Sequence, residues 1–254
     1  MHTAKKSLGQ NFLKSEGDLR TIIGAAALHK GDIVLEVGPG HGALTQKLLE
    51  TGAHVVAIEK DEALFAELHE TFKEKLEKKS ISLISGDILE FSPFEAVGVS
   101  PYVIVANIPY YITGQFIRKF LETNKQPSKM VLLVQKEVAE RICARDGKES
   151  LLSISVKAYG NPSYIDTVKA GSFVPKPKVD SAIICIDAIS RKNFENVNES
   201  RFFELLHRGF AHKRKLLRGN LGISAEILEK AGISPSARPE NLSISDWLQL
   251  SKIV

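Results

Sequence analysis

Residues 33–43 have the sequence Ile-Val-Leu-Glu-Val-Gly-Pro-Gly-His-Gly-Ala, and this stretch decides the fold that we expect. Its β-branched start predicts a buried strand, and its glycines allow the backbone to approach a ligand closely. The helical pattern that follows offers the free N–H groups of a helix N-terminus. As Gly-x-Gly-x-x-Ala the loop also fits a dinucleotide-binding fingerprint, although this signal is weak alone. A P-loop is excluded because no Gly-Lys-Ser or Gly-Lys-Thr ends the loop.

Short apolar runs alternate with helical patterns on the carboxyl side of this stretch. Such alternation is typical of βα units, so we expect an α/β fold with a doubly wound parallel sheet. The expected strands are residues 33–37, 55–58, 81–84, 102–106 and 130–134, and the expected helices are residues 44–49, 63–76 and 114–121.

The last third of the chain has a weaker pattern. Residues 182–187 predict a strand, whereas residues 151–158 alternate like a strand over too short a run for periodicity to decide. Residues 193–200 are polar, as in a linker, and residues 202–217 and 225–231 predict helices. We therefore expect a catalytic domain over residues 1–190 and a small all-helical domain over residues 191–254.

Composition narrows the class of protein. The 254 residues are 43% hydrophobic and 25% charged, which is typical of globular proteins and argues against disorder and against a membrane protein. The basic start at residues 1–7 has no apolar run behind it, so no signal peptide is expected and a cytoplasmic location is the default. Cys143 and Cys185 are too few for a disulfide framework or a zinc site. We expect no metal, and a monomer.

Charge is concentrated near the carboxyl end. Residues 1–189 carry 23 basic and 23 acidic side chains, whereas residues 190–254 carry 11 and 7. One stretch without acidic residues contains Arg208, His212, Lys213, Arg214, Lys215 and Arg218. Such a cluster favours binding to phosphates, and a solvated helix face is the alternative.

Two carboxylates follow neighbouring strands of the expected sheet. Glu59 ends the second strand, where the ribose diol of a nucleotide ligand would lie, and Asp87 follows the third. Open α/β sheets bind ligands at the carboxyl ends of their strands, so both are candidate ligand contacts. The alternative is that each one caps a helix or faces solvent in a loop.

The tetrapeptide Asn107-Ile108-Pro109-Tyr110 after the fourth strand points to the chemistry. The exocyclic amine of a base is a poor nucleophile until two acceptors hold its hydrogens, and the Asn107 side-chain oxygen and the Ile108 carbonyl would serve. Pro109 would stiffen the turn. Tyr110 would stack on a flipped base, and Phe173 is the candidate for a second stacking face. A dehydrogenase needs no such turn.

These motifs together resemble the ribosomal RNA adenine dimethyltransferases of the small subunit, known from kasugamycin sensitivity. The resemblance covers nearly the whole chain and rests on residues 7–13, 36–40, 59, 86–87, 107–111, 173–181 and 210–217. It implies a class I methyltransferase (Rossmann-like) fold that uses S-adenosylmethionine to dimethylate two adjacent adenosines near the 3′ end of 16S rRNA in the small ribosomal subunit.

The resemblance also implies roles for single residues. Gln10, Asn11 and Leu13 would close over the methionine end of the cofactor, with Gly38 and Gly40 beside its carboxypropyl chain. Glu59 would bind the ribose hydroxyls, Asp87 the adenine amine, and Asn107 both cofactor and target. Glu36 would orient the loop or contact the cofactor through water, or serve only the structure. In the basic cluster the implied RNA contacts are Arg208, Lys213, Arg214, Lys215 and Arg218.

Alternatives remain at the level of sequence. The related antibiotic-resistance enzymes methylate large-subunit RNA and share the Asn-Ile-Pro-Tyr turn, although the continuation Tyr111-Ile112-Thr113 resembles the small-subunit enzymes more closely. A non-catalytic RNA-binding assembly factor with a vestigial cofactor site is the hypothesis from another class. A nicotinamide dehydrogenase comes last, because no catalytic acid–base pair accompanies the glycine loop.

Overall fold

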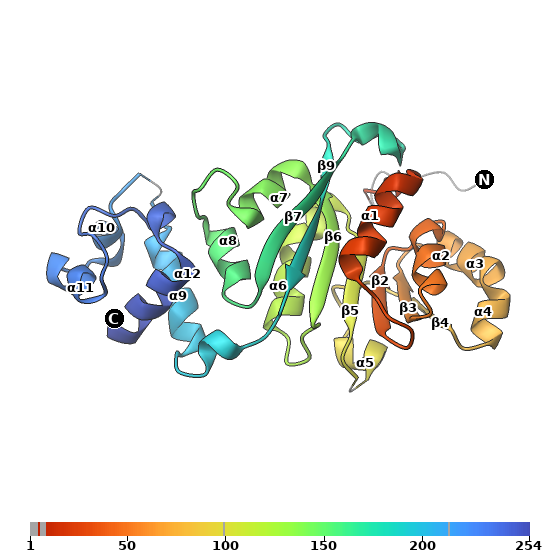
Figure 1. Cartoon of the computed structure of the whole chain (residues 1–254), viewed down its shortest axis with the longest axis horizontal. Helices are drawn as coiled ribbons and strands as arrows, with labels where there is room; N and C mark the ends of the chain where they lie inside the picture. The colour runs from red at the N-terminus through yellow and green to blue at the C-terminus, as the bar shows by residue number, and fades with distance from the viewer. Residues whose placement is uncertain (1–4, 6–8, 99, 213) are drawn as a thin grey trace. The chain divides into compact units, whose positions relative to one another are not determined.

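The computed structural model describes residue 5 and residues 9–98, 100–212 and 214–254. The chain divides into two compact units (Figure 1). The first contains the residues up to Ala139 together with Ser163–Ile189, and the second contains Glu140–Pro162 together with Ser190–Val254. The second unit resumes at Ser190, whereas the helical domain was expected over residues 191–254, and it also contains Glu140–Pro162, which was expected in the catalytic domain.

A seven-stranded sheet forms the centre of the first unit. Strands β2 to β6 are parallel to their neighbours, as predicted, whereas β9 runs antiparallel to β6. The interior of the sheet is apolar, and Leu35, Val55, Ile104 and Leu132 are all 0% exposed. The order is β4 (Ile81–Ser85), β3 (His54–Glu59), β2 (Ile33–Val37), β5 (Val103–Asn107), β6 (Lys129–Gln135), β9 (Ser181–Asp187) and β7 (Asn161–Val168).

Two helices of the first unit begin at side-chain caps. The Ser15 side chain accepts from the Asp18 N–H at the start of α1, and the Asp61 side chain accepts from the Ala63 N–H at the start of α3. Helix α1 packs beside α2 and against β6, and α3 packs against β4. The bounds are α1 (Glu16–Ala26), α2 (Ala43–Glu50), α3 (Glu62–Thr71), α4 (Lys73–Glu77), α5 (Pro93–Val97), η2 (Tyr110–Ile112), α6 (Thr113–Glu122), α7 (Lys136–Cys143) and η3 (Ala170–Ser172).

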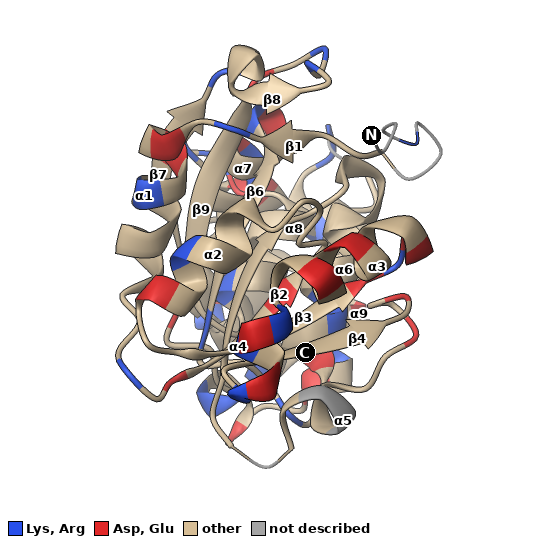
Figure 2. Ribbon diagram, turned by 90° about the vertical axis from the view of Figure 1, so that its right-hand side faces the viewer, with Lys and Arg blue, Asp and Glu red and all other residues tan. Residues whose placement is uncertain are grey.

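A two-stranded antiparallel sheet joins the start of the described chain to a much later segment. Strand β1 (Phe12–Leu13) pairs with β8 (Phe173–Val174), with Leu13 opposite Phe173 (Figure 2). The Lys14 N–H continues this pairing by donating to the Ser172 carbonyl at 2.9 Å. The pairing fixes the carboxyl end of residues 9–13, which we call the strap.

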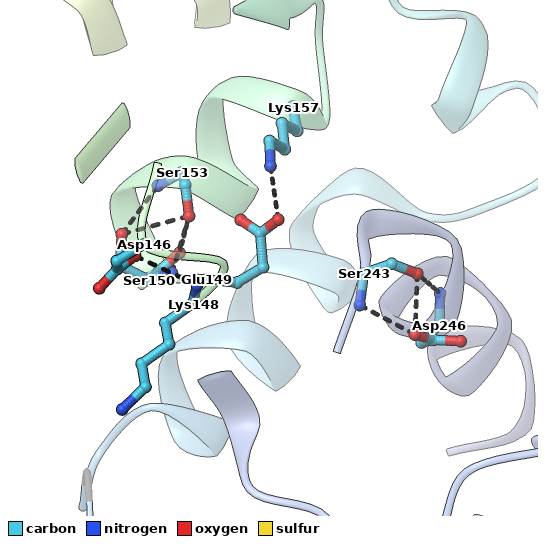
Figure 3. A network of polar contacts seen from close by, with 8 residues as sticks. All are labelled: Asp146, Lys148, Glu149, Ser150, Ser153, Lys157, Ser243 and Asp246. Carbon is cyan, nitrogen blue, oxygen red and sulfur yellow. Dashed lines mark hydrogen bonds and ion pairs between the residues drawn. The ribbon is translucent and has the colours of Figure 1, made fainter. Parts of the chain in front are cut away.

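The second unit is helical, and it decides a segment that the sequence left open. Residues 151–158 do not form a strand, because α8 (Leu151–Lys157) begins there with Ser150 as its N-cap. Ser150 and Ser153 form a reciprocal capping box, and Lys157 returns from the far end of the helix to pair with Glu149 (Figure 3). The other elements are η4 (Lys192–Phe194), α9 (Glu199–Gly209), α10 (Leu217–Leu221), α11 (Ala225–Lys230), η5 (Pro239–Asn241) and α12 (Ile244–Ile253).

One correction concerns the predicted helix over residues 202–217, which ends at Gly209 and is followed by a turn before α10 begins at Leu217. Helix α9 ends at Gly209, and Trp247 of α12 is fully buried beside it. A Cβ added to Gly209 would lie 2.3 Å from Cη2 of Trp247 and 3.2 Å from Cδ1 of Leu217. Only glycine therefore fits at the crossing of α9 and α12, where Gly209 meets Trp247. Among the described residues, no helix combines the length and the apolar character that a bilayer span requires.

This crossing gives a stability prediction. We expect Gly209→Ala to lower the free energy of unfolding by about 1–3 kcal/mol, because overpacking of the Trp247 ring exceeds the gain in helix propensity. Gly219→Ala in α10 is the matched control, since nothing lies within 4 Å of the added Cβ. Urea denaturation followed by circular dichroism measures both. Equal stabilities of the two variants would contradict the packing argument.

Candidate active site

A pocket opens in the first unit at the carboxyl ends of β2, β3, β4 and β5. The strap covers part of it, so that residues far apart in the sequence face one another. Its lining consists of Gly9, Gln10, Asn11, Phe12, Val37, Gly38, Gly40, Ile58, Glu59, Lys60, Leu64, Gly86, Asp87, Ile88, Leu89, Asn107, Ile108, Pro109, Tyr110, Tyr111 and Ile112.

The glycine loop needs its glycines for two reasons. Gly38, Gly40 and Gly42 have φ values of 66°, 60° and 81°, which L side chains rarely adopt. In addition, a Cβ on Gly40 would lie 2.8 Å from Cδ1 of Phe12, so the strap can rest on the loop only because no side chain is there. The loop thus provides bare backbone beside the pocket.

Glu59 lies at the end of β3 and is 6% exposed. Its Oε2 accepts from the Gly40 N–H at 3.2 Å and its Oε1 accepts from the Asp61 N–H at 2.9 Å. Burial raises the pKa of the Glu59 carboxyl, and the two N–H donors partly oppose this shift. Each oxygen keeps a second lone pair, so the carboxylate can hold the loop and still accept from a ligand hydroxyl.

Asp87 follows β4, as the sequence predicted. It accepts from Lys60 Nζ at 2.7 Å and from the Leu89 N–H at 2.9 Å. Partial burial alone would raise the pKa of Asp87, but Lys60 and the Leu89 N–H outweigh it and lower the pKa below its usual value. Asp87 is therefore an ionised acceptor at the pocket wall, suited to an amine donor.

A second hollow adjoins the pocket and shares Phe12, Gly38 and Asn107 with it. Glu36 lines this hollow and is 1% exposed, and neither of its oxygens has a hydrogen bond among the described residues. Burial raises the pKa of Glu36 to about 8. The nearby Thr45 hydroxyl lowers this pKa, although its geometry with the Glu36 carboxyl is not that of a hydrogen bond. The neighbouring Glu59 carboxylate raises it further. A buried carboxyl without a partner suits a cationic ligand group.

The turn after β5 places the predicted amine acceptor. Asn107 ends β5, and its Nδ2 donates to the Asn11 carbonyl of the strap at 2.9 Å. This bond commits the amide nitrogen, so the side-chain oxygen is the atom left to accept. Pro109 follows with φ −54° and ψ 130°, an extended geometry that ends the strand before η2.

The aromatic residues of the site have different environments. The Tyr110 hydroxyl lies 2.7 Å from the Ser181 hydroxyl, and burial raises its pKa. Tyr111 is 63% exposed. Phe173, which was expected to face the target base, is 2% exposed in the hydrophobic core and does not line either hollow. Its pairing with Leu13 draws it inward, so the structure does not bring Phe173 to the pocket.

The structure adds one residue that sequence reasoning missed. Asp61 is the N-cap of α3, and its side chain is 0% exposed. It accepts from Gln10 Nε2 at 3.0 Å and from Lys5 Nζ at 2.9 Å. The only local signal is an Asp two residues after Glu59 at a helix start, which predicts a cap and no more.

The basic cluster lies in the second unit. Arg214 and Lys215 are exposed in the turn between α9 and α10, and Arg218 is exposed in α10, whereas Lys213 lies outside the described residues. Arg208 is tied differently, because its guanidinium donates to the Leu221 carbonyl at 2.7 Å and so caps α10. The basic cluster therefore lies mainly in a turn and not on one face of a helix.

Comparison with known proteins identifies the family. The sequence matches the family described as ribosomal RNA adenine dimethylase over residues 1–254. The chain belongs to this family. It is 46% identical to the ribosomal RNA small subunit methyltransferase A of Dehalococcoides mccartyi, covering 97% of this chain and 87% of the relative. It is 40% identical to the protein of that name from Synechococcus elongatus, covering 97% and 94%.

Solved structures agree with the expected fold. A dimethyladenosine transferase from Plasmodium falciparum has a TM-score of 0.80 at 29% identity, with 94% of this chain and 95% of that chain covered. The 23S rRNA methyltransferase ErmE has a TM-score of 0.80 at 24% identity over 95% and 98%, a likeness that concerns the fold alone. The predicted class I methyltransferase fold with a helical carboxyl-terminal part is thus confirmed, and the dehydrogenase is excluded. Within the described residues no cluster of His, Cys, Asp and Glu could hold a metal ion.

The buried Glu36 gives a prediction about pH. Its folded pKa of about 8 lies above the ordinary 4.5, so the folded protein binds this proton more tightly than the unfolded chain does. The stability that the protonated Glu36 carboxyl contributes to the folded state is therefore fully present below pH 4.5. It is lost as the pH rises through about 8, where the buried carboxyl ionises. Glu36→Gln keeps the shape and cannot ionise.

We expect the free energy of unfolding to fall more steeply over this pH window in the wild type than in Glu36→Gln. Urea unfolding at a series of pH values measures the difference. The exposed Glu77→Gln is the control and should follow the wild type. Parallel curves for the wild type and Glu36→Gln would contradict the assignment.

Proposed function

We propose that the protein dimethylates the exocyclic amines of two adjacent adenosines near the 3′ end of 16S rRNA, using S-adenosylmethionine, and so acts in biogenesis of the small ribosomal subunit in the cytoplasm. The observation that carries the proposal is the Asn107 amide. Its nitrogen donates to the Asn11 carbonyl, which orients the amide so that its oxygen is left to accept beside a pocket with acidic walls. The family and the relatives named above support the substrate.

The groups around the two hollows fit S-adenosylmethionine. Glu36 is a buried carboxyl without a partner and suits the ammonium group of the methionine part. The bare backbone at Gly38 and Gly40 leaves room for the chain that follows it. Glu59 can accept from the ribose hydroxyls, and the ionised Asp87 can accept from the adenine amine. The cofactor supplies a methyl group made electrophilic by its sulfonium charge.

Positioning of the amine is the main task left to the protein. The Asn107 Oδ1 and the Ile108 carbonyl would each accept one hydrogen of the target amine, which favours a tetrahedral nitrogen with its lone pair directed at the methyl carbon. Tyr110 would stack on the base. No base has to remove a proton before attack, so orientation and electrostatics carry the rate.

We further propose that residues 191–254 contribute to RNA binding through Arg214, Lys215 and Arg218, together with Lys213, which precedes Arg214 in the sequence, and Arg208 near the end of α9. The excess of positive charge in this part of the chain and the exposure of the three described side chains support this assignment. A turn between helices presents its cations to phosphates from several directions.

The deciding experiment incubates the purified protein with tritiated S-adenosylmethionine and small subunits from cells that lack the endogenous enzyme, followed by nucleoside analysis. We expect dimethyladenosine in 16S rRNA. Label in large-subunit RNA alone would contradict the proposed substrate and favour a resistance methyltransferase. No label in any RNA, together with failure to bind S-adenosylmethionine in calorimetry, would contradict the enzyme and favour an assembly factor with a vestigial cofactor site.

Asn107→Ala separates chemistry from binding. We expect kcat to fall about 100-fold or more, because an amine acceptor is lost, while the affinity for the small subunit changes less than about twofold. Single-turnover kinetics and filter binding measure the two quantities. Asn161→Ala, at an exposed position, is the control. A proportionate loss of affinity and rate would contradict the role.

The basic turn gives a prediction about salt. In the double variant Arg214→Ala and Lys215→Ala, we expect RNA affinity to fall and the slope of log K against log salt to decrease by about 0.7–0.9 for each phosphate that the protein no longer neutralises. Lys230→Ala with Lys252→Ala removes the same charge elsewhere in the second unit and serves as the control. An unchanged slope in the first variant would remove the turn from the RNA interface.

A further inference from the structure

The buried Asp61 carboxylate makes more contacts than a helix cap needs. One oxygen suffices to cap α3, and Asp61 Oδ1 accepts from the Ala63 N–H at 3.1 Å. The same oxygen accepts from Lys5 Nζ, and Oδ2 accepts from Gln10 Nε2. Burial alone would raise the pKa of Asp61, but Lys5 and Gln10 outweigh it and lower the pKa, so the carboxylate is ionised where it meets both. The second carboxylate oxygen, Oδ2, therefore holds the strap through Gln10.

The strap is held at two points, with the site between them. Asp61 fixes Gln10 at one end, and the pairing of Leu13 with Phe173 fixes the other. Between these points the Asn11 carbonyl receives the Asn107 amide, and the Phe12 ring rests on Gly40. The position of the Asn11 carbonyl therefore depends on both anchors.

A chain of direct contacts thus leads from Asp61 to the Asn107 side chain. Asp61 holds Gln10, the next residue of the backbone is Asn11, and its carbonyl binds Asn107 Nδ2. Without the Asn11 carbonyl as acceptor, the Asn107 amide could rotate and present its nitrogen to the target amine. The hydrogen bond from the amine to the Asn107 oxygen would then be replaced by an unfavourable contact between two N–H donors. The orientation of Asn107 is what the strap secures.

We propose that Asp61 is a positioning residue for methyl transfer, which acts through Gln10 and Asn11 to orient the Asn107 side chain. The proposal rests on the proposed function, because the orientation matters for an amine substrate. The arrangement of the strap is a property of the protein without substrate, so it can be tested separately.

The main variant is Asp61→Ser. The serine hydroxyl can still cap α3, but serine has only one side-chain oxygen on a shorter side chain and cannot also hold Gln10. Asn198→Ser exchanges the cap of α9 in the same way and does not touch the strap, so it is the matched control. Lys5→Ala removes only the Lys5 side chain and leaves the cap and the Gln10 contact intact. We expect kcat to fall about 10- to 100-fold in Asp61→Ser, and less in Lys5→Ala.

Two readouts distinguish positioning from a merely structural role. Hydrogen exchange should accelerate about 10-fold or more at the amides of residues 9–13 in Asp61→Ser, with the rest of the chain unchanged. In the Asn107→Ala background Asp61→Ser should lower kcat hardly further, because both changes remove the same interaction. The affinity for the small subunit should stay unchanged.

Other outcomes overturn the proposal. Unchanged exchange at residues 9–13 in Asp61→Ser would show that Asp61 does not hold the strap. Additive losses of kcat in the double variant, or a loss of kcat that follows a chain-wide rise in exchange, would show that Asp61 does not act through Asn107. If the wild type transferred no methyl group to RNA, the proposed function would fail, whereas the exchange result would still decide whether Asp61 fixes the strap.

Discussion

The buried carboxylate of Glu59 is the interaction on which the rest of the site depends. It ends β3 and binds two backbone N–H groups, one from Gly40 in the glycine loop and one from Asp61 at the start of α3. Gly40 is the surface on which Phe12 rests, and Asp61 is the group that holds Gln10. A single charged side chain therefore sets the distance between the two structures that support the strap. Because it is buried, its hydrogen bonds compete little with water, and the loop can be rigid without side chains of its own.

The sequence was most informative where local pattern and tertiary structure agree. The strands from Ile33 to Gln135 are parallel, and all except the edge strand β4 are mostly buried, so their apolar runs mark them without help from distant residues. Glu59, Asp87 and Asn107 could be placed as well, because each follows a strand and parallel strands end at one edge. Asp61 escaped notice since its partners, Gln10 and Lys5, come from a segment with no apolar pattern. Phe173 lies outside both hollows, and its pairing with Leu13 joins two segments far apart in the chain, which no local pattern reveals.

The helical unit shows where periodicity fails. In the segment from Leu151 to Ala158 the buried apolar positions Ile154, Val156 and Ala158 alternate, although the segment is a helix. The deciding signal was the local capping by Ser150 and Ser153. Likewise the expected helix over residues 202–217 ends at Gly209, where the Trp247 ring leaves no room for a Cβ. No pattern around Gly209 reveals a ring that comes from a later helix, whereas the consequence is large: the basic residues that follow lie in a turn.

The pairing of β1 with β8 has a consequence for the order of folding. Residues 12 and 13 lie opposite residues 174 and 173, so the strap closes a loop that contains all of the parallel strands. Closing so long a loop costs chain entropy that only the completed sheet can offset, and contacts of high sequence separation form late. During synthesis the amino-terminal segment leaves the ribosome early and must wait for β8. A competent active site is therefore one of the last features that the nascent chain acquires.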